Sequence, residues 1–308
     1  MKSFVIAQSR AKKVIEFIFY GNYFYGFCAV SILLETVIQL NLSLDGLLIY
    51  FMAFIATILF YNYPYARRHS ATSNNPRTKW FVRHHRFVII NQIAFTIALL
   101  LCFIWLAITY QQEIKNLDGT RWILLLIFPM IGAMYYGANF LPRQYNLRRI
   151  GWLKPFAIGF VWAGMANVYP ILYADLIHSQ HSELSLIHCM LFLKTFMYVS
   201  MLALMFDIKD YEVDSRTQLS TLVVKIGLRK TIYFVIIPLT ILGLLTFLSY
   251  ALINHFGLLK MTLMMIPFIL LLASTRSFRK SRTLLYYLIV IDGLIIAKAF
   301  FGIVAMLV

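Results

Sequence analysis

The sequence contains little charge and few acidic residues. Only 13% of its 308 residues are charged, where a soluble domain has about 25%, and 61% are hydrophobic, with a mean hydropathy of +0.77. This shortage excludes an ordinary soluble domain and is typical of an integral membrane protein. The 28 Lys and Arg residues outnumber the 12 Asp and Glu residues. In a membrane protein such an excess collects in cytoplasmic loops, so we expect no nucleic-acid partner.

Cysteine is scarce as well. Cys28, Cys102 and Cys189 lie inside apolar runs, without CxxC or Cys/His spacing. The missing spacing argues against a Cys/His metal site, and we interpret the three as small hydrophobic residues. The N-terminal region also lacks the small-residue cleavage site of a signal peptide. We therefore expect its apolar run to be retained as the first membrane span.

Long apolar runs are abundant. A helix that crosses a hydrocarbon core of ~30 Å needs about 20 mainly apolar residues. On that criterion we predict an all-α membrane protein, with residues 1–308 forming a single polytopic domain. The fifth of the runs, residues 155–174, contains Gly159 and Gly164, and small residues of this kind let helices approach closely in lipid. The nine predicted spans are 17–39, 46–65, 87–110, 121–141, 155–174, 185–206, 231–253, 259–274 and 284–307.

The distribution of Lys and Arg predicts the orientation of these spans. With the N-terminus inside, the inner segments hold 23 of the 28 basic residues and the outer segments hold 3. Basic residues favour cytoplasmic loops. We therefore expect a multi-pass protein of the cell or inner membrane, with a cytoplasmic N-terminus and a C-terminus on the far side.

One acidic run stands out on this basic inner side. Asp207, Asp210 and Asp214 are spaced i, i+3 and i+7, which places their carboxylates on one face of a helix. Mg²⁺ prefers such oxygen ligands and is held by one or two carboxylates together with substrate phosphates. A solvated helix end is the alternative. Apart from this run and its Glu212, the inner side holds a single acid, Glu16, and this concentration favours a site.

A few ionisable residues lie within the predicted spans. They are Glu35, Lys194, Asp292 and Lys298. Ions in the membrane are costly and usually mark either function or pairing between helices. We favour polar contacts between helices for these residues.

The acidic run and the residues after it resemble the second aspartate-rich motif of the UbiA superfamily of intramembrane prenyltransferases. The run is followed by Arg216, by Thr221-Leu222 and by Lys225-Ile-Gly227, as in that family. The resemblance implies nine helices around a central, lipid-accessible cavity. It also implies Mg²⁺-assisted transfer of an isoprenyl group from a prenyl diphosphate to a lipid or aromatic acceptor, for example a quinone precursor.

The resemblance also implies the site residues. Asp207, Asp210 and Asp214 would be the metal ligands. The residues expected to bind the diphosphate are Asn62, Arg67, Arg68, Arg148, Arg149, Lys209 and Arg216.

The first aspartate motif of the family is missing. Of the family's NDxxDxxxD, this sequence keeps only Asn62, while Tyr63, Ala66 and Ser70 stand where the aspartates would be. One hypothesis is that Arg67 and Arg68 replace the lost metal site, because an arginine fork binds phosphate oxygens in pairs. A second is a protein that binds an isoprenoid or quinone-like lipid without turnover. A third is a transporter, for which the halves would be inverted repeats, and none is evident.

Overall fold

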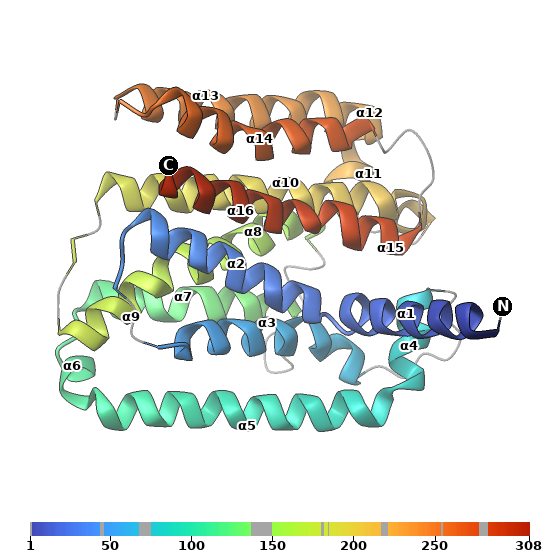
Figure 1. Ribbon diagram of the computed structural model, residues 1–308, viewed down its shortest axis with the longest axis horizontal. Coiled ribbons are helices and arrows are strands. Elements are labelled where there is room, and N and C mark those ends of the chain that lie inside the picture. Colours follow the sequence, from blue (N-terminus) through green and yellow to red (C-terminus); the bar gives the residue numbers. More distant parts are fainter. Residues whose placement is uncertain are drawn as a thin grey trace. The chain divides into compact units, whose positions relative to one another are not determined.

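Every regular element that the structure describes is a helix. The structure, a computed structural model, describes the backbone of residues 2–43, 46–67, 75–136, 150–179, 182–183, 185–216, 221–253, 255–276 and 283–308. Within these ranges there is no strand, and the helices are shown in Figure 1. The side chains of residues 2–9, 67, 212–214, 216 and 250 lie outside the description. The all-α class predicted from hydropathy is confirmed.

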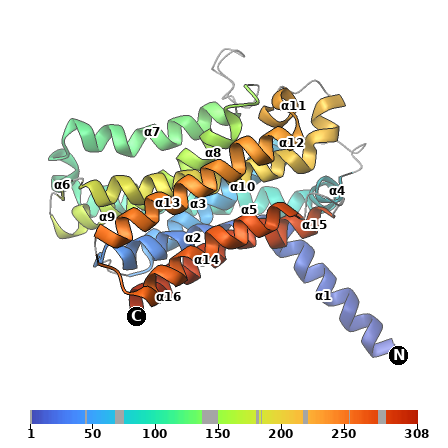
Figure 2. The ribbon, with the colours of Figure 1, turned by 90° about the horizontal axis from the view of Figure 1, so that it is seen from above.

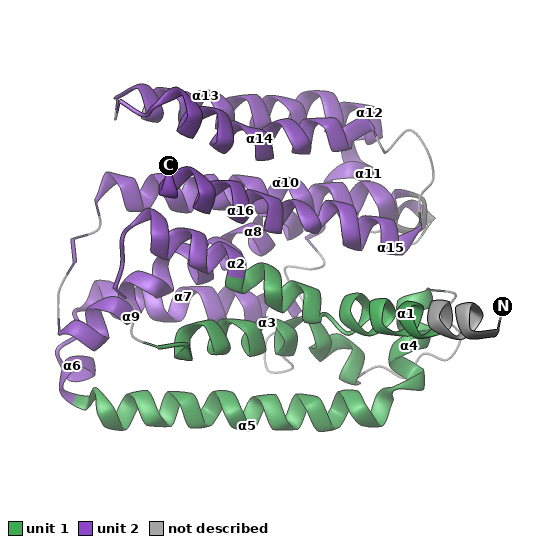
Figure 3. Ribbon diagram, viewed as in Figure 1, with its two compact units in different colours: residues 1–30, 46–111 green, residues 31–45, 112–308 purple. Residues whose placement is uncertain are grey.

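The chain divides into two compact units (Figure 3). Unit 1 comprises residues 1–30 and 46–111, and unit 2 comprises residues 31–45 and 112–308. The division passes through the second helix, α2 (Tyr23–Gln39). A single polytopic domain stays a prediction.

Unit 1 is built around the contact between α3 and α5, and the short amphipathic helix α4 contacts α1, α3 and α5. Asn75 caps α4, because its side chain accepts a hydrogen bond from the Arg77 backbone N–H at 2.9 Å. The bounds are α1 (Lys2–Tyr20), α3 (Leu48–Arg67), α4 (Pro76–Arg83) and α5 (His85–Thr109).

A break separates α1 from α2 inside the first predicted span. Gly21 and Asn22 interrupt the helix, and Asn22 has a φ of 67°. Asparagine tolerates this left-handed conformation better than most residues do. The helical segments Arg10–Tyr20 and Tyr23–Gln39 are bent by 60° at this point. The first predicted span is therefore a broken helix.

Unit 2 is centred on α10, which packs against α8, η2 and α13, while α14 packs against α13 and α16 (Figure 2). Its elements after α2 are α6 (Gln111–Lys115), α7 (Gly119–Tyr136), α8 (Lys154–Ala163), η2 (Gly164–Val168), α9 (Tyr169–His178), α10 (Leu186–Arg216), α11 (Leu222–Ile226), α12 (Leu228–Thr231), η3 (Ile232–Ile236), α13 (Ile237–Ile253), α14 (Leu258–Ser274), α15 (Leu284–Tyr286), η5 (Tyr287–Ile291) and α16 (Gly293–Leu307).

Close packing of α8 on α10 depends on a glycine. A Cβ on Gly159 would lie 2.1 Å from Ser200 Oγ and 2.7 Å from the Phe196 carbonyl oxygen. A Cβ on Gly164 would lie 2.1 Å from the Phe128 ring. The predicted role of the small residues in the fifth span, close approach of neighbouring helices, is confirmed.

The described residues include seven helices long and apolar enough to cross a membrane, or eight if the bent pair counts as one. Helix α14, at the eighth predicted span, has 17 residues and is shorter than these. An integral multi-pass membrane protein is thus supported, while the count of nine, the orientation and the central cavity stay predictions. Helix α10 continues to Arg216, ten residues beyond the predicted end of its span.

Candidate acidic site on helix α10

The aspartate run lies within the last turns of α10 rather than after its end. The segment between Leu186 and Arg216 contains no glycine or proline, so nothing in it breaks the helix at the end of the apolar stretch. Asp207 is 0% exposed, and its Oδ1 accepts a hydrogen bond from Lys154 Nζ at 2.5 Å. Lys154 is the first residue of α8. The packing of α8 on α10 thus brings together two charged residues that are 53 positions apart.

The second oxygen of Asp207 is buried without a hydrogen-bond partner in the described part of the chain. Leaving a buried charged acceptor unsatisfied costs on the order of 1–3 kcal/mol or more. Native proteins satisfy most such groups, and an exception points to a water, an ion or a ligand. The Asp207 Oδ2 atom is therefore the position of this site at which a water, an ion or a ligand could bind.

Asp210 lies one turn further along the same face of α10 and is much more accessible. Its side chain is 43% exposed and forms an ion pair with the neighbouring Lys209. Asp207 and Asp210 are three residues apart, so both carboxylates approach the same region. The site runs from a buried carboxylate to one that meets solvent. Lys209, expected to bind diphosphate, contacts Asp210 here, and its predicted role stays a prediction.

These two carboxylates fit a divalent cation. Mg²⁺ is a hard cation that takes oxygen ligands, and it is commonly bound through one or two carboxylates plus substrate phosphates. Asp207 offers an unsatisfied oxygen, and Asp210 offers a partly exposed carboxylate. No group of three or more metal-ligating side chains occurs among the described side chains, which do not include that of Asp214. Asp214 as a third ligand therefore stays a prediction.

The residues after the run form a compact turn whose sequence has a clear physical basis. The Thr221 side chain accepts a hydrogen bond from the Val224 N–H at 3.3 Å and so caps α11, which packs on α10. Gly227 ends α11 with a φ of 86°, a conformation that favours glycine. The Thr-Leu pair and the Lys-x-Gly of the motif thus build the helix that follows the site.

Asn62 lies in unit 1 and holds the broken helix together. Its Oδ1 accepts from Asn22 Nδ2 at 2.6 Å, and its own Nδ2 donates to the Gly21 carbonyl at 3.3 Å. Asn62 is buried, and both ends of its amide are engaged at the break between α1 and α2. This scaffolding contact was not predicted. Binding of diphosphate by Asn62 stays a prediction.

Unit 1 also places an arginine among aromatic rings. The Arg77 guanidinium lies 5.8 Å from the centroid of the Tyr25 ring and 5.5 Å from that of Tyr65. Its Nε donates to the Tyr20 carbonyl at 3.4 Å. Cation–π contacts of this kind stabilise a charge at the edge of an apolar region. The Asn75-Pro76 pair before Arg77 marks the start of the helix that carries it.

Other predicted site residues fall outside the description. Arg67 ends α3, and Asp214 and Arg216 belong to α10, but their side chains are not described. The residues that lie wholly outside the described ranges are Arg68, Arg148 and Arg149.

A second ionic cluster in unit 2 has a different character. Glu35 is buried, and its carboxylate accepts from Lys298 Nζ at 2.6 Å and from Lys194 Nζ at 3.2 Å. Gln39 Nε2 donates to the same carboxylate at 3.1 Å. Both Glu35 oxygens are therefore satisfied. The cluster joins α2, α10 and α16, which agrees with the predicted role of these residues as polar contacts between helices.

The comparisons with known proteins support the fold. No protein-family profile matches the chain, and no curated protein matches it by sequence. A solved structure from work on digeranylgeranylglyceryl phosphate synthase in membranes is similar, with a TM-score of 0.54 and 15% identity. The match covers 96% of this chain and 99% of that one, so it concerns the fold of the whole chain. The chain therefore shares the fold of this membrane protein, which is consistent with the resemblance drawn from the aspartate motif on α10.

Proposed function

We propose that this protein transfers an isoprenyl group from a prenyl diphosphate to a lipid or aromatic acceptor within the membrane. The observation that carries the proposal is the state of Asp207. It is fully buried in a prenyltransferase fold, with one carboxylate oxygen on Lys154 and the other without a partner in the described residues. A buried carboxylate with one unpaired oxygen is suited to bind a cation, such as a metal ion that carries the diphosphate. The protein would work in the cell or inner membrane with its N-terminus in the cytoplasm.

The proposed chemistry is governed by charge. Ionisation of an allylic diphosphate leaves negative charge on the departing diphosphate and positive charge on the allyl carbon. When bound, Mg²⁺ would be held by Asp207 and Asp210 and would neutralise the diphosphate. Preorganised cations at such a position stabilise the developing charge more strongly than water does.

The side chains of the site have separate tasks in this proposal. Lys154 is held by Asp207, so its ammonium group is oriented before substrate arrives. Lys209 is held in the same way by Asp210, the more exposed of the two aspartates. Burial of Asp207 keeps water from competing for its free oxygen. The contributions of Asn62, Arg148, Arg149 and Arg216 are expectations from the family resemblance, and Arg67 and Arg68 would take the place of the missing first aspartate motif.

Transfer of a radiolabelled prenyl group in membranes containing the full-length protein tests this function. We expect product with Mg²⁺, loss of product with EDTA, and recovery when Mg²⁺ is restored. Asp207→Ala should lower the rate at least about 100-fold, the order seen when an electrostatic stabiliser of a reaction is removed. Glu183→Ala removes an exposed acid outside the site and serves as the matched control. Full activity of Asp207→Ala would overturn the site assignment.

A second candidate is a protein that binds a prenyl diphosphate and does not turn it over. The sequence favours this candidate at one place, since Tyr63, Ala66 and Ser70 stand where the first aspartate motif would be. It predicts Mg²⁺-dependent binding of the diphosphate, weakened by Asp207→Ala, without any transferred product. Measurement of bound and transferred label in the same sample separates the two candidates.

A further inference from the structure

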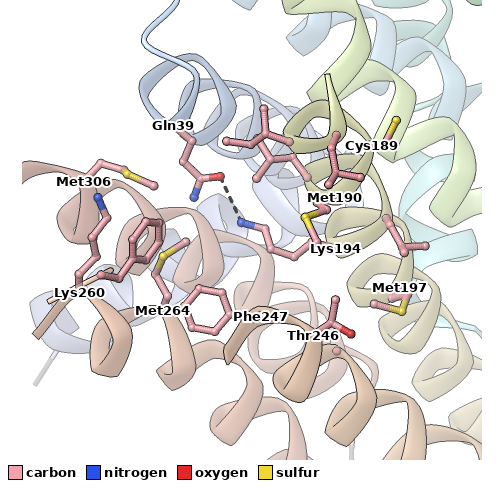
Figure 4. A pocket seen from close by; sticks show the side chains of 16 residues that line it. Gln39, Cys189, Met190, Lys194, Met197, Thr246, Phe247, Lys260, Met264 and Met306 are labelled. Atoms are coloured by element: carbon pink, nitrogen blue, oxygen red, sulfur yellow. Dashed lines mark hydrogen bonds between the residues drawn. The ribbon is translucent and has the colours of Figure 1, made fainter. Parts of the chain in front are cut away.

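Unit 2 contains a cavity that the proposed reaction does not use. Its volume is about 480 Å³, within the range of pockets that bind small ligands. It is lined by residues of α2, α10, α13, α14 and α16, together with Phe256 (Figure 4). Lys194 lies in its wall, 13 residues before Asp207 on α10, which is about 20 Å along the helix axis. The cavity is therefore separate from the aspartate site.

The lining of the cavity suits a flexible hydrocarbon chain. Four methionines contribute to it, Met190, Met197, Met264 and Met306, and all are labelled in Figure 4. Methionine side chains are unbranched and adapt to apolar ligands of irregular shape. The rim is apolar and accessible, since Leu186 is 74% exposed and Leu193 is 46% exposed. In a membrane-spanning helix bundle, such a rim opens toward lipid.

The charged residues of the lining are of one sign. Lys194 and Lys260 belong to it, and no acidic residue does. Lys194 donates to Gln39 Oε1 at 3.2 Å, the contact drawn in Figure 4, and to Glu35 behind the wall. Glu35 also pairs with the buried Lys298, so this cluster has one more positive than negative charge.

Lys260 adds a second positive charge. Its ammonium lies 4.6 Å from the centroid of the Phe256 ring, and it has no carboxylate partner in the described part of the chain. An apolar cavity with an excess of ammonium groups on its wall is complementary to an amphiphile with an anionic head. A soluble anion would gain nothing from the methionine lining.

We propose that this cavity binds one membrane phospholipid with an anionic headgroup. An acyl chain occupies the methionine-lined interior, and the phosphate lies between Lys194 and Lys260. In the predicted orientation this end of α10 faces the outer leaflet, which would supply the lipid. A zwitterionic headgroup carries its own cation, which the two lysines repel, so the site discriminates by headgroup charge.

Native mass spectrometry of the full-length protein in a neutral detergent tests this site. Phosphatidylglycerol and phosphatidylcholine with identical acyl chains are added in equal amounts. We expect the protein to retain phosphatidylglycerol about fivefold better, because an ion pair at a partly exposed site is worth up to ~1 kcal/mol. Lys260→Gln should remove most of this preference. Lys115→Gln makes the same charge change at an exposed lysine of α6 and should leave the preference unchanged.

A second pair of variants tests the cavity itself. Thr246 lines it and donates its hydroxyl to the Leu242 carbonyl at 2.8 Å. Thr246→Trp should fill the cavity and reduce lipid retention at least fivefold. Thr262 makes the equivalent contact with the Leu258 carbonyl at 2.8 Å but does not line the cavity. Thr262→Trp should retain lipid, and thermal unfolding of all variants shows which of them fold.

Several results would overturn the proposal. Equal retention of the two lipids would mean that the cavity takes an apolar chain alone. Unchanged preference in a folded Lys260→Gln variant would remove the headgroup contact. A dimer that Thr246→Trp dissociates, with no change in bound lipid, would assign the cavity to a second copy of the chain. None of these readouts depends on prenyl transfer, so this proposal and the proposed function fail or stand separately.

Discussion

Two buried carboxylates of unit 2 differ in how their oxygens are satisfied: Glu35 of α2, which pairs with Lys194 of α10, and Asp207, which belongs to α10 itself. Glu35 has both oxygens satisfied, by Lys298, Lys194 and Gln39. Asp207 has one oxygen on Lys154 and one that is buried without a partner in the described residues. A saturated carboxylate contributes to stability and has no capacity left for a ligand. The unsaturated one retains that capacity, and the difference separates a structural cluster from a candidate site.

The prediction with the largest expected effect concerns Glu35. Glu35→Gln leaves two lysines in the membrane without a counter-charge, and removing one partner of a buried pair typically costs about 3–5 kcal/mol. We expect a clearly lower midpoint of thermal unfolding in detergent, with prenyl transfer per folded molecule unchanged. An unaltered midpoint would show that the cluster does not stabilise the fold.

Asp207→Asn should have the opposite effects, with little change in stability and a large loss of prenyl transfer. Asp207 neutralises a single lysine, and Lys154 is 24% exposed, so solvent can stabilise its charge when the carboxylate is lost. The amide oxygen can also still accept from Lys154, so we expect the unfolding midpoint to change little. Loss of the charge should reduce prenyl transfer at least about 100-fold, or about 2.7 kcal/mol in transition-state free energy. Parallel measurement of rate and midpoint checks this. If the midpoint falls as far as in Glu35→Gln, Asp207 is a structural residue and the contrast disappears.

A glycine beside Glu35 offers a smaller and more local test. A Cβ on Gly302 would lie 2.5 Å from Glu35 Oε1, whereas one on Gly293, at the start of the same helix, would meet nothing within 4 Å. Overpacking of this kind typically costs about 1–3 kcal/mol. We expect Gly302→Ala to lower the unfolding midpoint and Gly293→Ala to leave it unchanged or slightly raised. Equal midpoints for the two variants would mean that the cluster relaxes around the added methyl group.

The smallest effect is expected at Asp210. Its carboxylate is 43% exposed and already has Lys209 beside it, so solvent screens part of its contribution. Asp210→Asn should raise the Mg²⁺ concentration for half-maximal transfer about three- to tenfold. A tenfold increase corresponds to a loss of ~1.4 kcal/mol in the free energy of Mg²⁺ binding. A titration of transfer rate against Mg²⁺ measures it. A loss of transfer rate as large as that of Asp207→Asn would show that burial does not determine which of the two aspartates contributes more.

Much of the fold could be predicted because its signals are local. Apolar runs identify the helices, and the spacing of Asp207 and Asp210 requires only that α10 continue through them, which it does. Thr221 and Gly227 cap and end a short helix through their own chemistry, but that helix was not predicted, since these residues served only for the family resemblance.

The partners of the charged residues could not be predicted. Lys154 and Asp207 are 53 residues apart, and Glu35 and Lys298 are 263 apart. Spacing along a helix carries no information about such pairs, because they depend on which helices pack together. The break at Gly21 and Asn22 was missed for a different reason. Hydropathy averages over this dipeptide, although its composition is typical of a turn.

The length of α14 has a consequence for the surrounding bilayer. At 1.5 Å per residue its 17 residues extend about 26 Å, less than a typical hydrocarbon thickness of ~30 Å. If α14 crosses the membrane as the predicted eighth span, the hydrophobic mismatch is relieved when the bilayer thins locally or when Lys260, in the first turn of α14, extends its ammonium toward the headgroups. Membranes of long-chain lipids should therefore strain this side of the protein more than membranes of short-chain lipids.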